Sequence, residues 1–348
     1  MDARLYTSPM RHQLVTAYLL LISPVFLVEA QPPGFASQSG KSDPAEVTGL
    51  FHWIHSTADA DRGVAFYRAV FNMELTNSPF GTPIPGATAT PLRPRAEGSS
   101  DPLVWDLTNT HGSRFRNAFM KIPGVEFGHE LSEFSGIDQT TILANLWNPG
   151  ATMLILNVAS IDSALEALMK AGGDIVSIGG SARIANTRAV IGRDPDGYLL
   201  ELIESPHPGG AIGLSVTNLE KTRRFYEDLL GFKIQTPAKF ESNRREFLGL
   251  RRGEYRVSSA LVPNTSIRIE FYEFRGVEAQ PVRYRFQDPG APQFQFRVSD
   301  LDRLLQESKR RNVPFVSAGQ RPIQRPFGRF VFVTDPDGVF VEFVQPNN

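Results

Sequence analysis

The chain has 348 residues, which is long enough for two domains with cores of their own. It contains no cysteine, so disulfides, thiolate metal sites and cysteine nucleophiles are excluded. Any metal would be held by histidine, carboxylate or amide groups. The formal net charge is −1 and the basic residues are dispersed, so the sequence has no electrostatic footprint for nucleic acid binding.

The N-terminal segment has the features of a targeting signal. Two arginines precede an apolar run over 14–28, and a small-residue pattern predicts cleavage before Gln31. The run is short for a membrane-spanning helix and contains a proline, although an uncleaved anchor is the alternative. We therefore expect a signal peptide over 1–30, a flexible Pro-, Gly- and Ser-rich linker over 31–48, and a secreted or periplasmic protein.

A characteristic turn occurs twice in the chain. Asp194-Pro-Asp-Gly197 precedes Glu201, and Asp335-Pro-Asp-Gly338 precedes Glu342. Proline fixes φ, aspartate bonds nearby backbone and glycine accepts positive φ, so the pattern predicts a tight turn. Because alternating apolar runs flank both copies, each turn is predicted to lead into a last strand.

A strand followed by a helix also recurs. The helix carries the pair Phe66–Tyr67 in the first copy and Phe225–Tyr226 in the second. The inward residue of the strand stands fourteen positions before the phenylalanine, and it is His52 in one copy and Ala211 in the other. These repeats divide the chain into four units, two in each half.

Each unit is predicted to contain a strand, a helix and three further strands. The units begin near 50, 151, 211 and 292, and the expected helices cover 60–72, 161–171, 218–230 and 300–311. Strands interrupted by single amphipathic helices predict an α+β protein. The first unit also carries a long Pro-, Gly- and Thr-rich insertion over 76–112, and loops of this length are usually functional or disordered.

These repeats and motifs resemble the vicinal oxygen chelate (VOC) superfamily, which includes glyoxalase I, extradiol dioxygenases and bleomycin-resistance proteins. The resemblance covers nearly all of 49–346. It implies four βαβββ modules forming two tandem glyoxalase-like domains, over 49–205 and 209–346. It also implies a concave face holding a divalent metal that chelates two neighbouring substrate oxygens. The family includes lyases, isomerases, dioxygenases and metal-free binders, so the resemblance specifies the fold more than the activity.

The resemblance implies two metal-ligand positions in each module, one on its first strand and one on its last. In chain order these positions hold His52 and Glu130, Met153 and Glu201, Ala211 and Glu270, and Gln293 and Glu342. Met153 and Ala211 are interpreted as core packing. Carboxylates among apolar neighbours are costly to bury unless they are paired or bind a metal, so the four glutamates are candidate ligands or bases.

The pairing of modules decides which candidates meet, and the sequence leaves it open. Pairing within each half gives two sites that each lack one ligand. Pairing across the halves gives one complete set and one set with carboxylates alone. The complete set is His52, Glu130, Gln293 and Glu342, which suits an octahedral Zn, Ni, Co, Mn or Fe ion with two open positions.

Two functions follow as hypotheses. The first is a metal-dependent lyase or isomerase of glyoxalase type, with Glu130 or Glu342 as the catalytic base acting on a small oxygen-chelating substrate. The alternative is a metal-free protein that sequesters a small molecule, as bleomycin-resistance proteins do. Because only one ligand position holds a histidine, the two-His-one-Glu set of extradiol dioxygenases is disfavoured. A monomer or homodimer is expected.

The sequence assigns no function to the other histidines. His55, His111, His129 and His207 are interpreted as surface or loop residues.

Overall fold

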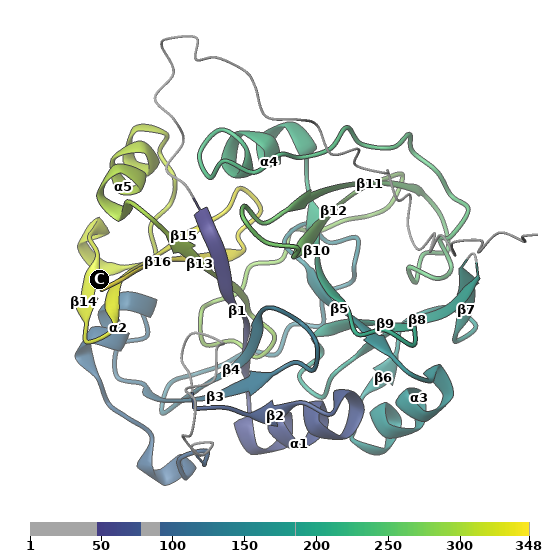
Figure 1. The fold of residues 1–348 in the computed structure, drawn as a ribbon, viewed down its shortest axis with the longest axis horizontal. Helices are drawn as coiled ribbons and strands as arrows, with labels where there is room; N and C mark the ends of the chain where they lie inside the picture. Colours follow the sequence, from purple (N-terminus) through teal and green to yellow (C-terminus); the bar gives the residue numbers. More distant parts are fainter. Residues whose placement is uncertain (1–46, 78–90, 185, 348) are drawn as a thin grey trace, which may run out of the picture.

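The computed structural model describes residues 47–77, 91–184 and 186–347 (Figure 1). The signal peptide predicted over 1–30 and the linker up to residue 46 lie outside the described residues. Within the described part of the chain, no helix is both long and apolar enough to cross a membrane.

The described chain is built from four modules, each opening with a strand and a helix. The first contains β1 (Val47–Thr57), α1 (Ala60–Phe71), β2 (Glu74–Leu75), β3 (Arg114–Lys121) and β4 (Gly128–Ser135). The second contains β5 (Thr152–Val158), α3 (Ile161–Lys170), β6 (Asp174–Ile175), β7 (Ala182–Ile184), β8 (Thr187–Arg193) and β9 (Leu199–Glu204). The third contains β10 (Gly210–Val216), α4 (Leu219–Tyr226), β11 (Glu254–Leu261) and β12 (Arg268–Arg275). The fourth contains β13 (Pro292–Val298), α5 (Leu301–Arg310), η2 (Ala318–Gln320), β14 (Ile323–Arg325), β15 (Gly328–Thr334) and β16 (Phe340–Pro346).

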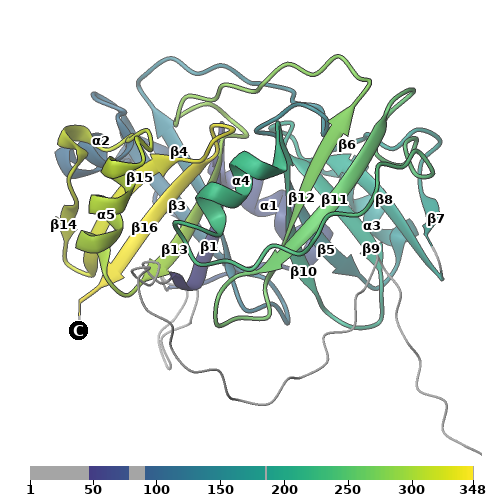
Figure 2. The ribbon, with the colours of Figure 1, turned by 90° about the horizontal axis from the view of Figure 1, so that it is seen from above.

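The modules pair across the two halves of the chain. The first sheet has the order β14-β15-β16-β13-β1-β4-β3-β2, so it joins the first and fourth modules. The second sheet has the order β11-β12-β10-β5-β9-β8-β6, so it joins the second and third. Antiparallel pairs β1–β13 and β5–β10 form the two seams. The two sheets lie side by side in Figure 2. The structure thus selects one of the two pairings that the sequence left open.

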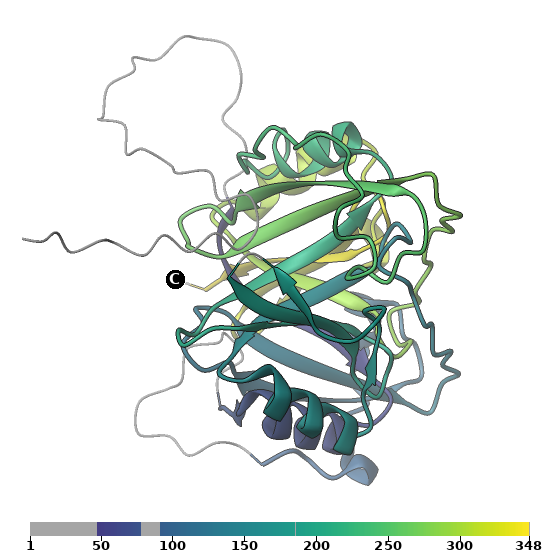
Figure 3. The ribbon, with the colours of Figure 1, turned by 90° about the vertical axis from the view of Figure 1, so that its right-hand side faces the viewer.

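Helix–turn contacts join the modules of each half. The Tyr67 hydroxyl on α1 donates to Asp194 Oδ2 at 2.9 Å, in the turn before β9. The Tyr226 hydroxyl on α4 likewise donates to Asp335 Oδ2 at 3.1 Å, before β16. In Figure 3 the helices α1 and α3 lie at the bottom and α4 and α5 at the top, flanking the sheets. Sheet seams and helix–turn contacts together connect the four modules into a closed ring.

Two local differences from the expected elements have physical reasons. The helix expected over 218–230 ends at Tyr226, because the next turn widens as Asp228 N bonds Arg223 O, five residues back. The third module has two strands after its helix, whereas three were expected. Much of the intervening segment forms turns, with Phe247 and Leu248 buried in a core cluster instead.

The long insertion forms local structure where it is described. It contains η1 (Arg95–Glu97) and α2 (Pro102–Thr108). Asp101 caps α2 by accepting from Leu103 N at 2.9 Å, and its other oxygen contacts Arg325 Nη1 of β14 at 3.1 Å. The insertion therefore fastens the first module to the fourth beside the first sheet.

Candidate metal and substrate site

The cross-half pairing brings polar side chains together on one face of the first sheet. His52 pairs with Gln295 across the β1–β13 seam, and Gln295 pairs with Glu342 on β16. In the adjacent row, Ile54 lies between Glu130 on β4 and Gln293 on β13. Because paired residues on neighbouring strands are about 5 Å apart, the two rows form a compact polar group.

A hydrogen-bonded relay connects three of these residues. Gln295 Nε2 donates to Glu342 Oε2 at 2.8 Å, and Gln295 Oε1 lies 2.9 Å from His52 Nδ1. An amide whose nitrogen faces a carboxylate presents its oxygen to the histidine, so Nδ1 carries the proton. His52 Nε2 is then an unprotonated nitrogen. It is buried and makes no hydrogen bond among the described residues.

The other two candidates bond to residues of the first module. Glu130 Oε1 accepts from Asn117 Nδ2 at 3.2 Å and from Ser132 Oγ at 3.1 Å. Gln293 Nε2 donates to Ser56 Oγ at 3.0 Å. Both side chains are buried and line the same cavity as Glu342.

Burial shifts the protonation of this group. It raises the pKa of Glu130 to about 7, which the bonds from Asn117 and Ser132 oppose. It raises the pKa of Glu342 to about 8, which the bond from Gln295 opposes. It lowers the pKa of His52 to about 4, so the imidazole is neutral at neutral pH. A neutral imidazole beside two proton-exchanging carboxyls is a chemically competent donor set for a divalent metal or for acid–base work.

The polar group lies at a cavity of about 380 Å³. Its polar part is lined by Glu130, Gln293, Gln295 and Glu342. His52 lies fully buried beside them, and its ring centroid is 5.3 Å from that of Phe119. Val104 and Leu107 of α2 form part of the wall. The insertion thus contributes to the cavity, as its length suggested. A volume of this size falls in the range of small-molecule sites.

The profile of the Glyoxalase/Bleomycin resistance protein/Dioxygenase superfamily matches residues 49–202 and 210–343. The chain belongs to this superfamily. Its sequence is 24% identical over 195 residues to the lactoylglutathione lyase GLX1 of Arabidopsis thaliana, a match that covers 53% of this chain and 55% of that protein. A probable chloroplastic lactoylglutathione lyase of the same plant is 25% identical over 191 residues, with 53% and 45% covered. The chain spans about half the length of these curated relatives.

Solved structures support the superfamily fold. Glyoxalase I from Zea mays superposes with a TM-score of 0.55 at 21% identity, covering 85% of this chain and 92% of that one. A putative dioxygenase from Bacillus subtilis has a TM-score of 0.50 at 13% identity, with 87% of each chain covered. At these identities the likeness establishes two tandem glyoxalase-like domains, and it leaves the activity to the site itself.

The second VOC sheet repeats the geometry without the ligands. Ala211 and Ile155 pair where His52 and Gln295 pair in the first sheet, and Met153 pairs with Gly213. The remaining carboxylates are Glu201 and Glu270. Glu270 is held by the Tyr272 hydroxyl at 2.6 Å and by Arg268 Nε at 2.9 Å.

The space beside these second-sheet carboxylates is also smaller, at about 60 Å³. Phe247 and Leu248, from the segment between α4 and β11, line it together with Tyr255. This sheet therefore keeps the glutamates of the VOC pattern without a histidine, a glutamine or a comparable cavity.

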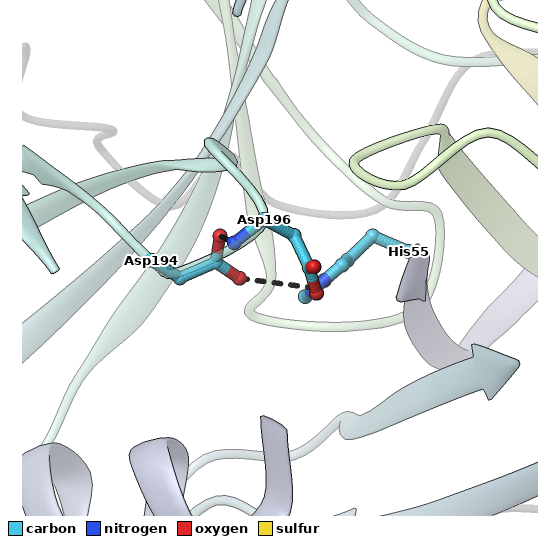
Figure 4. Close-up of side chains that lie close together, drawn as sticks. All are labelled: His55, Asp194 and Asp196. Carbon is cyan, nitrogen blue, oxygen red and sulfur yellow. Dashed lines mark hydrogen bonds and ion pairs between the residues drawn. The ribbon is translucent and has the colours of Figure 1, made fainter. Parts of the chain in front are cut away.

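A tighter group of potential ligands lies on the opposite face of β1. Ligand atoms of His55, Asp194 and Asp196 all lie within 4.8 Å of one another (Figure 4). Among the described residues, His52, Glu130 and Glu342 do not form a group this tight. His55 Nε2 is 3.2 Å from Asp194 Oδ2. Asp194 Oδ1 accepts from two backbone amides, and Arg62 bonds Asp196.

The duplicated half accounts for the two aspartates of this tighter group. Asp335 accepts the corresponding two backbone amides and the Tyr226 hydroxyl, while Asp337 bonds Thr217 N at 3.0 Å. Leu214 stands at the position that corresponds to His55. Because the same carboxylate arrangement forms beside a leucine, the aspartates dock the turn of one module on the helix of another with or without a histidine beside them.

Two histidine assignments made from the sequence are wrong. His55 and His129 were expected at the surface, but both are fully buried, with ring centroids 5.1 Å apart. Burial lowers the pKa of His129 well below its ordinary value, so it packs as a neutral ring. His111 and His207 are exposed, as expected. Strand parity placed His55 away from His52 but gave no measure of what covers that face.

Gln295 is the residue that sequence reasoning missed. The family resemblance places the ligand position of the fourth module at Gln293. Gln295 stands two positions further along the same strand and therefore lies on the same face. Parity alone could have added it as a candidate. Its bonds to His52 and Glu342 required the strand register.

Proposed function

We propose that this VOC chain is a metal-dependent lyase or isomerase of glyoxalase type, acting on a small molecule with two neighbouring oxygens. The observation that carries the proposal is His52 Nε2, a buried and unbonded nitrogen beside two glutamates of raised pKa. The duplicate sheet lacks this arrangement, so the fold alone does not require it. Similarity to lactoylglutathione lyases of plants adds support.

The residue types of this set suit a divalent metal, whose binding would draw the side chains closer together than they lie in the structure. His52, Glu130, Gln293 and Glu342 would hold it, and Gln295 would orient two of these ligands. When bound, such a metal polarises substrate oxygens and acidifies the neighbouring C–H.

The chain's own groups supply the proton chemistry. With pKa values of about 7 and 8, Glu130 and Glu342 both exchange protons near neutral pH, which suits a general base that later returns the proton. Asn117 and Ser132 hold Glu130 in place, and Gln295 holds Glu342. The apolar cavity wall limits access of water to the abstracted proton.

Metal content of the mutated full chain tests this proposal. We expect one divalent ion per chain after purification without chelator, with a large loss in His52→Ala and Gln293→Leu. Glu201→Ala in the second sheet is the matched control and is expected to retain the ion. Unchanged metal content in His52→Ala would falsify the metal site. If only Gln293→Leu loses the metal, the ion lies closer to β13 than proposed.

A metal-free binding protein is the second candidate, because the cavity wall is largely apolar and needs no ion to accept a ligand. The two candidates differ in their response to chelator. Ligand affinity that is insensitive to EDTA, with no turnover after metal reconstitution, would favour the binder.

We also propose that residues 1–30 direct export and are removed. The support is the charged start, the apolar run and the small-residue pattern before Gln31. N-terminal sequencing of protein expressed with a functional export pathway tests this. An N-terminus near Gln31 is expected, and an intact Met1 in the mature protein would contradict it.

A further inference from the structure

The wall of the first cavity contains a continuous strip of aromatic rings. Seven of its lining side chains are phenylalanines. Four of them are in sequential contact: the ring centroids of Phe115 and Phe134 are 5.2 Å apart, Phe134 and Phe286 are 5.6 Å apart at 90°, and Phe286 and Phe332 are 4.7 Å apart at 81°. Such edge-to-face arrangements present ring faces and edges that favour another aromatic ring.

The fold does not require two of these rings, Phe286 and Phe332. Phe115 and Phe134 have the aromatic counterparts Tyr255 and Phe274 in the second sheet. The chain repeats with Asn148-Pro-Gly-Ala151 matching Asp288-Pro-Gly-Ala291, which sets Leu146 at the position of Phe286. Ile191 pairs with Glu201 as Phe332 pairs with Glu342, so Ile191 is the counterpart of Phe332. Leu146 and Ile191 are fully buried in the core cluster beside the second sheet. Aliphatic side chains therefore replace two of the four rings beside the second sheet, where the space has closed to about 60 Å³ and Phe247, Tyr255 and Tyr272 are the aromatic lining residues.

The cavity offers little for a highly charged ligand. Among the residues that the structure describes, its lining includes three charged side chains, of which Arg325 is the one cation, and Arg325 is already 3.1 Å from Asp101. Two of the three are the glutamates of the polar group. Charged ligand groups placed against the phenylalanine wall would lose hydration without a partner, at a cost of several kcal/mol each.

We infer that the ligand of this cavity carries an aromatic ring beside the carbon atoms that bear its neighbouring oxygens, and at most one negative charge. The statement that the ligand carries neighbouring oxygens rests on the proposed function. The ring preference rests on the cavity wall alone. The oxygens of the ligand would face the polar end of the cavity, and its ring would face the phenylalanine strip. The polar end consists of Glu130, Gln293, Gln295 and Glu342. An aryl 2-oxoacid is the simplest probe of this class, and it binds without reacting because neither of its oxygen-bearing carbons carries a hydrogen.

Three monoanions that share the 2-oxoacid group test the inference: benzoylformate, cyclohexylglyoxylate and pyruvate. Their binding to the full chain would be measured by calorimetry after loading with Co²⁺ and, separately, in EDTA. We expect benzoylformate to bind at least tenfold more tightly than pyruvate. It should also bind roughly 3- to 10-fold more tightly than cyclohexylglyoxylate, because aromatic contacts add to simple area burial.

The variants Phe286→Leu and Phe332→Ile introduce the side chains that stand at the corresponding positions beside the second sheet. Each is expected to lower benzoylformate affinity roughly 3- to 10-fold and to leave pyruvate affinity unchanged. Phe240→Leu, which removes a ring held over Arg256 and Arg275 outside the cavity, is the matched control and should change neither.

The outcomes separate the two proposals. If Co²⁺ is bound and the three acids bind equally, or both cavity variants behave like wild type, the ring preference is overturned while the metal site stands. If no metal is taken up but benzoylformate is preferred and the cavity variants lose that preference, the lyase proposal fails and the ring preference is supported.

Discussion

One amide side chain controls the geometry of the candidate metal site. Gln295 bonds both His52 and Glu342, so replacing it removes the partner of the histidine Nδ1–H and frees the carboxylate. We expect Gln295→Leu to weaken metal binding by about 10- to 100-fold, as is typical for residues that orient ligands. Titration of the full chain with Co²⁺, followed through its absorption spectrum, measures this.

A conservative variant separates orientation from packing. Gln295→Glu keeps the length of the side chain and an acceptor for His52, but it places a third acidic group beside Glu342. We expect it to retain the fold, and to alter the Co²⁺ spectrum. If both Gln295 variants bind the metal with wild-type affinity, Gln295 has no positioning role.

The buried carboxyl of Glu201, in the second sheet, is expected to make the stability of the folded chain depend on pH. Burial raises its pKa from 4.5 to about 8, and the charge of Glu270 adds to the shift. The unfolded chain therefore ionises first, so stability is full below about pH 4.5 and declines as the pH rises through about 8. We expect Glu201→Gln to remove this decline and to raise Tm at pH 9, by about 2–4 °C per kcal/mol gained.

Thermal unfolding at several pH values checks the Glu201 prediction. At pH 5 the variant and the wild type should be close, since the carboxyl is neutral in the folded state. Glu278→Gln, an exposed carboxylate paired with Arg252 at 3.7 Å, is the control. A Tm difference of equal size at pH 5 and pH 9 would show that titration is not its cause.

For single residues, the sequence predicts the face of the strand on which a side chain lies better than it predicts the residues that the side chain contacts. The alternation of side chains along a strand alone places His52 and Ile54 on one face and His55 on the other, as in the structure. All four glutamates chosen from the repeats are buried, and Met153 and Ala211 pack in a core cluster. Which glutamate pairs with an arginine, and which with an amide, depends on neighbouring strands that are distant in the chain. Whether His52, Glu130, Gln293 and Glu342 bind a metal stays a prediction.

Helix α2 is the element that connects the insertion to the candidate substrate cavity. Asp101 both caps the helix and pairs with Arg325, while Val104 and Leu107 reach the cavity wall. Loss of a cap costs about 1 kcal/mol, and a partly exposed ion pair adds up to about 1 kcal/mol. We expect Asp101→Ala to increase hydrogen exchange over 102–108 several-fold with a small change in global Tm.

The cap of another helix provides the comparison. Asp300 caps α5 by accepting from Arg303 N at 3.0 Å, and α5 does not line the cavity. Asp300→Ala should increase exchange in α5 and leave ligand affinity unchanged, whereas Asp101→Ala should weaken benzoylformate binding. Equal ligand affinity in the two variants would separate α2 from ligand recognition.

Elements with strong local signals were predicted closely. Helices α1, α3 and α5 agree with the expected ranges to within one residue at most ends, because caps and helical periodicity are local properties. The end of α4 and the missing third strand of its module were not foreseen. In both cases, tertiary packing decides between a regular element and an extended turn.

The whole molecule is a closed ring of modules, and this closure explains why pairing could not be read from the sequence. Within each half, Tyr67 and Tyr226 bond the turns at Asp194 and Asp335. Across the halves, β1–β13 and β5–β10 complete the sheets. Both kinds of interface bury alternating apolar strands and amphipathic helices, so the same residue pattern is consistent with either pairing.

The seams predict that the two halves stay together without a covalent connection. The segment 205–209 links β9 to β10, and Pro206 and His207 within it are exposed, so a protease site can be inserted there. Cleavage should leave a 1:1 complex, because each sheet contains strands of both fragments. Its Tm should become dependent on protein concentration, as for any two-component complex. Size-exclusion chromatography and thermal unfolding after cleavage measure this, with the uncut chain as control. Separation into two folded fragments would mean that each half can complete its own sheets, and that the ring is not the stable arrangement in solution.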